Sequence, residues 1–215
     1  SSTAGLIAGG ENASNANVAN VELWNGSAWT ETTDMNTVTR IAGATKSSTN
    51  TAVMSFGGLA AGNSLSDKNE YWNGSSWTEL NNLNTAKYGL SGAGVYPSAL
   101  AFAGYTTTNI ANTESWDGTS WTEVNDLNTA RRGGGSGGTN TSALFFGGDP
   151  SKANTEAWNG TSWSEVADLS PAQQWGGSTA SQSNTSNLFF GGQPQVTTTQ
   201  SWEAGDFAIK TVTTS

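Results

Sequence analysis

One short motif, Trp-[Asn/Asp]-Gly-[Ser/Thr]-x-Trp, occurs four times in this 215-residue chain. Its first tryptophan recurs at steps of 42 to 48 residues, at Trp24, Trp72, Trp116 and Trp158, and a degenerate copy, SWEAGDF, carries Trp202. Apolar runs that end in small residues keep nearly the same period, with their last residues at Gly10, Gly58, Gly104, Gly148 and Gly192. Repeats of about 40 to 50 residues with several short strands each are the sequence signature of propeller blades.

Each repeat divides into four expected strands, called strands A to D here in chain order. Strand A is rich in glycine, which suits a place beside a crowded central channel, and strand B is the apolar run. Strands C and D form a hairpin whose turn needs positive φ angles, supplied by Asn25-Gly26, Asn73-Gly74, Asp117-Gly118 and Asn159-Gly160. The pattern predicts an all-β fold, a five-bladed β-propeller of four-stranded antiparallel blades. We expect one domain over residues 1–215, with repeats of about 1–39, 40–86, 87–130, 131–172 and 173–215.

The recurring tryptophans are expected to hold the fold together. A tryptophan at the same place in every blade is best placed to pack one blade against the next, and each indole brings a large apolar surface. We therefore expect a buried structural set made of Trp24, Trp29, Trp72, Trp77, Trp116, Trp121, Trp158, Trp163 and Trp202. Trp175 is different, because it stands in a strand A and has no counterpart in the other repeats.

A glutamate also recurs in strand C, at Glu22, Glu70, Glu114 and Glu156. Paired carboxylates serve glycosidases, but a catalytic pair is needed once in a site and not once in every blade. We expect these carboxylates to bind backbone amides or an arginine such as Arg40 or Arg131 between blades.

The first repeat starts late. Aligning Gly10 with Gly148 matches Leu6 to Leu144, so the sequence begins at strand B of the first blade. Aligning Phe207 with Trp163 places the next strand A beyond Ser215, so the C-terminal tail TVTTS can finish strand D of the fifth blade but cannot supply the absent strand. We expect a first blade of three strands whose inner edge is open or is filled by upstream sequence, a neighbouring chain or solvent. An unpaired edge is unfavourable, so a chain extended upstream by about 5 to 10 residues is expected to be more stable.

Composition excludes several functions. The net charge is −9 and the eight Lys and Arg residues are scattered, which argues against nucleic-acid binding. No apolar run approaches the roughly 20 residues of a membrane span. The chain has no His and no Cys, so it lacks the ordinary ligands of copper or zinc and the residues of Ser-His-Asp and Cys-His systems. We expect no metal, no cofactor and no enzymatic activity.

The order of the motifs resembles the Kelch repeat of galactose-oxidase-type β-propellers. The resemblance rests on [Ala/Gly]-Arg, a glycine-rich strand, an apolar strand ending in Gly-Gly, then Asn-x-x-Glu-x-Trp and a second Trp, and it covers nearly the whole chain. Kelch repeats usually carry Tyr before the hairpin, where this chain has Trp, and Lys87 and Gln173 stand where one repeat has Arg131. The Asn/Thr-rich composition is also similar to repetitive propellers of bacteriophage tail fibres and bacterial surface adhesins. That resemblance implies an adhesive role on a virion or in an extracellular setting.

Variation among the repeats indicates a binding face. In a four-stranded blade the B–C and D–A connections emerge on one face, and here these loops vary while the C–D hairpins are constant, as on a rigid scaffold that carries a recognition surface. The first residues of strand A at the channel mouth are taken as Ile41, Tyr88, Arg132 and Gln174. The predicted ligand-binding set is Tyr88, Tyr105, Arg132, Gln174 and Trp175, which could stack on a sugar and donate hydrogen bonds.

Two functions remain open at this point. One is a non-enzymatic module that recognises a cell-surface glycan or another surface polymer through several similar blades. The other is a structural propeller whose partner is a protein of the same particle or complex.

Overall fold

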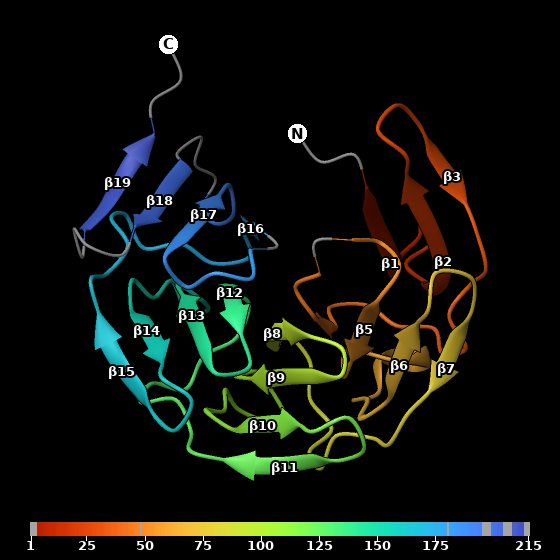
Figure 1. The fold of residues 1–215 in the computed structure, drawn as a ribbon, viewed down its shortest axis with the longest axis horizontal. Helices are drawn as coiled ribbons and strands as arrows, with labels where there is room; N and C mark the ends of the chain where they lie inside the picture. The colour runs from red at the N-terminus through yellow and green to blue at the C-terminus, as the bar shows by residue number, and fades with distance from the viewer. Residues whose placement is uncertain (1–3, 48, 180, 195–198, 204–207, 213–215) are drawn as a thin grey trace.

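The computed structural model describes residues 4–47, 49–179, 181–194, 199–203 and 208–212, the last range in its backbone only. Its strands form five antiparallel sheets arranged as the blades of a propeller (Figure 1). Blade one holds β1 (Gly5–Glu11), β2 (Asn17–Trp24) and β3 (Trp29–Glu31). Blade two holds β4 (Gly43–Ala44), β5 (Val53–Phe56), β6 (Asn69–Trp72) and β7 (Trp77–Glu79), with the short 3-10 helix η1 (Ala61–Asn63) between β5 and β6.

The other three blades repeat this plan. Blade three holds β8 (Ser91–Val95), β9 (Ser98–Phe102), β10 (Thr113–Trp116) and β11 (Trp121–Val124). Blade four holds β12 (Gly135–Thr139), β13 (Ser142–Phe146), β14 (Thr155–Trp158) and β15 (Trp163–Val166). Blade five holds β16 (Gly177–Ser178), β17 (Ser186–Phe190), β18 (Thr199–Glu203) and β19 (Ala208–Val212). The predicted fold class is confirmed: the chain is an all-β propeller of five blades, and the first blade has three strands, in the order β1-β2-β3.

The hairpin turns form as their sequence predicts. In blade two Trp72 pairs with Trp77 across the β6–β7 hairpin, and the Asn73 side chain accepts the amide N–H groups of Ser75 and Ser76 at 2.9 and 3.0 Å. Gly74 has a φ of 100°, which few residues other than glycine adopt. A local Asx turn and a positive φ together fix the hairpin, so each of blades one to four forms this unit from its own sequence.

The fifth hairpin has a different register from the predicted one. In blade four Trp158 pairs with Trp163, but in blade five Trp202 pairs with Ile209. Ile209 therefore occupies the register position that Phe207 was expected to take, and Phe207 itself lies outside the described residues. The paired positions Trp202 and Ile209 are seven residues apart, against five for Trp158 and Trp163, because Glu203 and Ala208 form one additional pair in blade five. The degenerate SWEAGDF copy lacks the Asn-Gly-Ser/Thr sequence of the other turns.

The core lies between the blades. The last residue of strand B in blades two and three, Phe56 or Phe102, meets the second tryptophan of the next blade edge to face. The ring centroids of Phe56 and Trp121 lie 5.1 Å apart, and those of Phe102 and Trp163 lie 4.9 Å apart. Edge-to-face pairs of this kind add to the large apolar area that the rings remove from water. The buried tryptophans are Trp72, Trp77, Trp116, Trp121, Trp158, Trp163 and Trp202.

Blade one differs from the others, because its two tryptophans are not fully buried. Trp24 is half-buried, and Trp29, expected to be buried with the others, has 45% of its surface exposed. The prediction is wrong for Trp29 because its counterparts are covered by the blade that precedes them in the ring, and no described residue of another blade covers this face of blade one.

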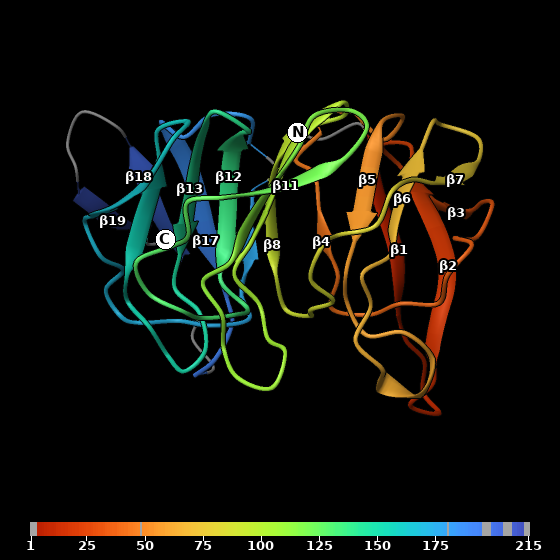
Figure 2. The same cartoon turned by 90° about the horizontal axis from the view of Figure 1, so that it is seen from below.

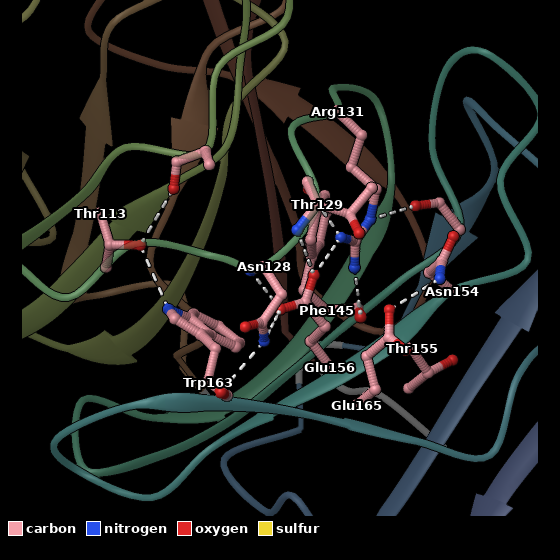
Figure 3. A network of polar contacts seen from close by, with 12 residues as sticks. Thr113, Asn128, Thr129, Arg131, Phe145, Asn154, Thr155, Glu156, Trp163 and Glu165 are labelled. Atoms are coloured by element: carbon pink, nitrogen blue, oxygen red, sulfur yellow. Dashed lines mark hydrogen bonds and ion pairs between the residues drawn. The ribbon is translucent and has the colours of Figure 1, made fainter.

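Three of the recurring glutamates, Glu70, Glu114 and Glu156, are buried between blades, where they bind the connection that precedes strand A. Glu22 is exposed, so the expectation is wrong for that residue, because no described residue of a preceding blade lies against it. Figure 3 shows the contacts of Glu156. Oε2 of Glu156 accepts the backbone N–H of Asn128 at 2.7 Å and its side-chain amide at 2.8 Å, while Oε1 bonds Nη1 of Arg131. Nε1 of Trp163 donates to Oγ1 of Thr113 at 3.1 Å, which ties blade four to blade three. A buried carboxylate with this many donors is satisfied, so its recurrence reflects assembly of the blades.

Candidate binding face at the channel mouth

The two variable connections meet at one end of the strands. Isolated β-bridges join the residue ahead of strand A to the first residue of the B–C loop in blades two to five, namely Arg40 with Leu59, Tyr88 with Tyr105, Arg132 with Asp149, and Gln174 with Gln193. Seen from the side, η1 in a B–C loop lies at the opposite end from the β6–β7 hairpin (Figure 2). Arg40 is thus the true counterpart of Tyr88, Arg132 and Gln174, and the assignment of Ile41 to that place was shifted by one residue.

Arg132 is the centre of a compact cluster on this face. Its guanidinium carbon lies 4.3 Å from the ring centroid of Tyr105, 5.3 Å from that of Tyr88 and 5.9 Å from that of Trp175. Nη1 donates to the Tyr88 hydroxyl at 2.8 Å, and Nη2 lies 2.8 Å from Oδ2 of Asp149. The cation is enclosed by aromatic rings and neutralised by one carboxylate, an arrangement that holds all three rings in fixed positions.

Trp175 lies over the channel mouth and stays partly open to solvent, with 37% of its surface exposed. A Cβ placed on Gly133 would lie 2.6 Å from the indole ring, and one on Gly89 would lie 3.2 Å from it. The indole therefore rests directly on the glycine backbone of two neighbouring blades. Only glycine at these two positions lets the ring approach so closely.

A line of backbone hydrogen bonds supports Trp175 from below. Ile41, Gly89, Gly133 and Trp175 occupy equivalent places in blades two to five, and all four have a positive φ. The N–H of Gly89 donates to the carbonyl of Ile41 at 3.0 Å, that of Gly133 to Gly89 at 2.8 Å, and that of Trp175 to Gly133 at 2.6 Å. These hydrogen bonds run around the channel mouth from blade two to blade five, and they fix the backbone position of Trp175 at the mouth.

The channel below the mouth is polar. A cavity of about 360 Å³ is lined mostly by glycine, serine and alanine residues in and next to the inner strands, together with Ile41, Lys46 and Trp175. Serine hydroxyls join the inner strands of adjacent blades: Ser91 Oγ donates to the carbonyl of Gly134 at 3.0 Å, and Ser136 Oγ donates to that of Gly92 at 2.9 Å. Burial in this channel lowers the pKa of Lys46 to about 8. The channel is thus a narrow polar passage, and the wide aromatic surface is at its mouth.

The predicted ligand-binding residues are largely brought together. Tyr88, Tyr105, Arg132 and Trp175 form one cluster, whereas the side chain of Gln174 lies beside it and accepts the backbone N–H of Ser151 at 3.0 Å. Asp149, the partner of Arg132, was missed as a site residue. Its position directly after a Gly-Gly pair is the signal that could have found it, because that position pairs with the residue ahead of strand A in each of these blades.

Among the residues that the structure describes, no three His, Cys, Asp or Glu side chains gather as metal ligands would. The same part of the chain contains no helix of the length and apolar character needed to cross a membrane.

Comparison with known proteins identifies the fold. No protein family and no curated protein sequence matches this chain. Solved structures do match, among them one described as the structure of YjhT, with a TM-score of 0.76 and 14% sequence identity, covering 97% of this chain and 80% of that chain. At this identity the similarity shows the propeller fold alone. A propeller of this kind supports a binding or interaction module, and the site itself must supply any finer function.

Proposed function

We propose that this chain is a non-enzymatic recognition module that binds a glycan or another surface polymer at the channel mouth. The observation that carries the proposal is the exposed indole of Trp175, held beside Tyr88, Tyr105 and Arg132 on the variable face. An exposed aromatic ring on a rigid support is suited to stack on the apolar face of a sugar, because little conformational freedom is lost on binding.

The charge of the cluster favours a neutral ligand. Asp149 already neutralises Arg132, and the chain as a whole carries a net charge of −9, so an acidic polymer would be repelled over most of the surface. Tyrosine hydroxyls and loop amides would then supply hydrogen bonds to sugar hydroxyls. Such a site binds weakly by itself and gains from several copies, as on a fibre or a cell surface.

The setting that we propose is extracellular or on a virion. Its support is the resemblance of the Asn/Thr-rich repeats to those of phage tail fibres and bacterial surface adhesins, together with the Kelch-like order of the motifs. The alternative is a propeller that serves as an assembly part and binds a protein of the same particle.

A glycan array followed by affinity measurement tests the proposal. Saturable binding to neutral glycans is expected, and Trp175→Ala with Tyr88→Ala is expected to weaken it about tenfold or more, since ring stacking contributes about 0.5 to 1.5 kcal/mol per aromatic pair. Trp29→Ala is the matched control, because it removes another exposed indole that lies away from this face. Unchanged affinity in the double variant would remove the site. No binding across the array, combined with stable association with another protein, would favour the alternative.

A further inference from the structure

The ring of blades is open. Figure 1 shows a gap between blade five and blade one. A cavity of about 880 Å³ occupies the inner side of this gap. Its walls are β1 and the segment 39–45 on one side, and Thr179 and Ser181, which follow β16, on the other. This is the place where strand A of blade one would lie, since inner strands elsewhere pair with strand B on its channel side.

Blade one presents an uncovered surface to the gap. Trp29 and Ile7 are 45% and 52% exposed, whereas Trp121 and Ala101, their counterparts in blade three, are 5% and 0% exposed. Glu22 is exposed as well, although its counterparts Glu70, Glu114 and Glu156 are buried and bind the Asn-Thr segment or Asn of the preceding connection. Blade one therefore has the half of an interface that normally receives the preceding blade.

Blade five presents the opposite half. Phe190 and Leu188 are 45% and 37% exposed, whereas Phe146 and Leu144, their counterparts in blade four, are buried against blade five. A Cβ on Gly191 would meet no atom within 4 Å, but one on Gly147 would lie 2.4 Å from the carbonyl oxygen of Gln173 at the start of the next blade. Blade five is thus shaped to be followed by another blade.

The backbone hydrogen bonds that join neighbouring blades also end at the gap. In blades one to four the second residue of the Gly-Gly or Ala-Gly pair is a glycine. Its backbone N–H donates to the carbonyl oxygen of a residue in the connection that leads into the next blade. These bonds run from Gly10 to Thr39, Gly58 to Lys87, Gly104 to Arg131 and Gly148 to Gln173, at 2.7 to 3.0 Å. Among the described residues the N–H of Gly192, the fifth member, has no acceptor. Among the described residues, the contacts that join one blade to the next are therefore missing on both sides of the gap.

We infer that the gap is the docking site of one further blade of the same repeat, joined to this chain in the same polypeptide, which also brings the inner strand of blade one. A single blade carries both complementary halves, so it can cover Phe190 with its second tryptophan and cover Trp29 with its own strand B. A second copy of this chain would instead join head to tail through one half and leave the other half open.

The inference fixes what the added blade must contain. To cover Trp29, the added blade must carry a phenylalanine as the last residue of its own strand B, as blade three carries Phe102 against Trp163. To bind Glu22, the added blade must carry an Asn-Thr pair in the connection after its own fourth strand, as Asn128 and Thr129 bind Glu156. Residues 84–139 of this chain meet both requirements, because they run from the connection before β8 through β11 to the end of β12.

A chain extended after Ser215 by a second copy of residues 84–139 tests the fit. The sequence has no Cys, so a single Ile7→Cys reports whether blade one is covered, with Ala101→Cys as the buried control. In the unextended chain Ile7→Cys is expected to react with a thiol reagent at least tenfold faster than Ala101→Cys. In the extended chain its rate is expected to fall to that of the control, and the unfolding midpoint is expected to rise by about 5 °C or more.

Three results would overturn the inference. The first is protection of Ile7→Cys in the unextended monomer, which would mean that five blades close on themselves. The second is protection that grows with concentration as oligomers form, which would assign the gap to a second copy. The third is the absence of protection both in this extended chain and in one that carries residues 87–141 ahead of Ala4. Phe102→Asp in the added copy alone is the matched control and is expected to restore fast labelling.

Discussion

Nη1 of Arg131 bonds Oε1 of Glu156, and neither side chain reaches solvent. In blade five the same two places are taken by Gln173 and Gln200, whose side chains are joined by a hydrogen bond of 2.6 Å. The same pair of positions is thus ionic in blade four and neutral in blade five. The neutral form avoids the cost of removing two charges from water, while both forms satisfy the buried donors and acceptors.

Removing half of the ion pair should be far more harmful than replacing all of it. We predict that Glu156→Gln lowers the free energy of unfolding by about 3 to 5 kcal/mol, because the buried guanidinium of Arg131 loses its counter-charge. Adding Arg131→Gln to that variant should recover most of the loss, since blade five already uses the two glutamines. Urea unfolding of both single variants and of the double variant measures the coupling. A double variant less stable than Glu156→Gln would contradict the prediction.

The first blade and an interior blade should respond differently to the same substitution. Trp121→Ala is expected to cost about 3 to 5 kcal/mol, because this indole is buried against Phe56. Trp29→Ala removes the equivalent residue of blade one and is expected to cost less than about 1 kcal/mol, since nearly half of the side chain is in water. Thermal or urea unfolding of the pair is the measurement. Equal losses would show that blade one is covered in solution.

The sequence predicted the blades because they are built from local signals. An Asn-Gly turn, a Gly-Gly stop and a period above 40 residues each act within one repeat, so the four-stranded plan and the three-stranded first blade could be read directly. The contact between Trp29 and another blade could not, because it depends on closure of the ring and not on the repeat itself. Likewise the register at Ile209 depends on a turn whose motif has degenerated.

The candidate site was predictable in part for the same reason. Alternation of constant and varied loops placed Tyr88, Tyr105 and Arg132 on one face, and topology alone brings those loops together. The ion pair with Asp149 and the position of Trp175 across two other blades are tertiary contacts. They follow from a positive φ and from glycines on neighbouring blades, which a single repeat does not reveal.

The position of Trp175 should depend on the glycine beneath it. Gly133→Ala places a methyl group where the indole now rests and also strains a backbone with a φ of +63°. If the channel mouth binds a glycan, this variant should lose affinity for the best ligand of the array by about fivefold, since one well-placed ring contact is worth roughly 1 kcal/mol. Gly62→Ala is the control, because its φ is +67° and its Cβ would meet nothing within 4 Å. Equal affinities of the two variants would argue against a role for the indole.

The channel lysine should make the stability of the protein depend on alkaline pH. Desolvation lowers the pKa of Lys46 to about 8 in the folded protein, while an unfolded lysine titrates near 10.4. Between these values the unfolded chain binds more protons than the folded chain, so the free energy of unfolding should rise as the pH increases from about 8 to about 10.4. The contribution of Lys46 should be at most about 3 kcal/mol. Burial also lowers the pKa of Lys87, against the opposing effect of Glu114, and this acts in the same direction.

Lys46→Met separates the two lysines. The variant should be more stable than the natural protein at pH 7, because no ammonium group has to leave water, and its stability should rise less steeply above pH 8. Lys68→Met is the control, since the Lys68 side chain is 43% exposed. Urea unfolding at intervals from pH 7 to 10.5 gives the slope for each protein. If Lys46→Met and the natural protein had the same slope, Lys46 would have to be hydrated in the channel, and the channel would then be open to water along its length.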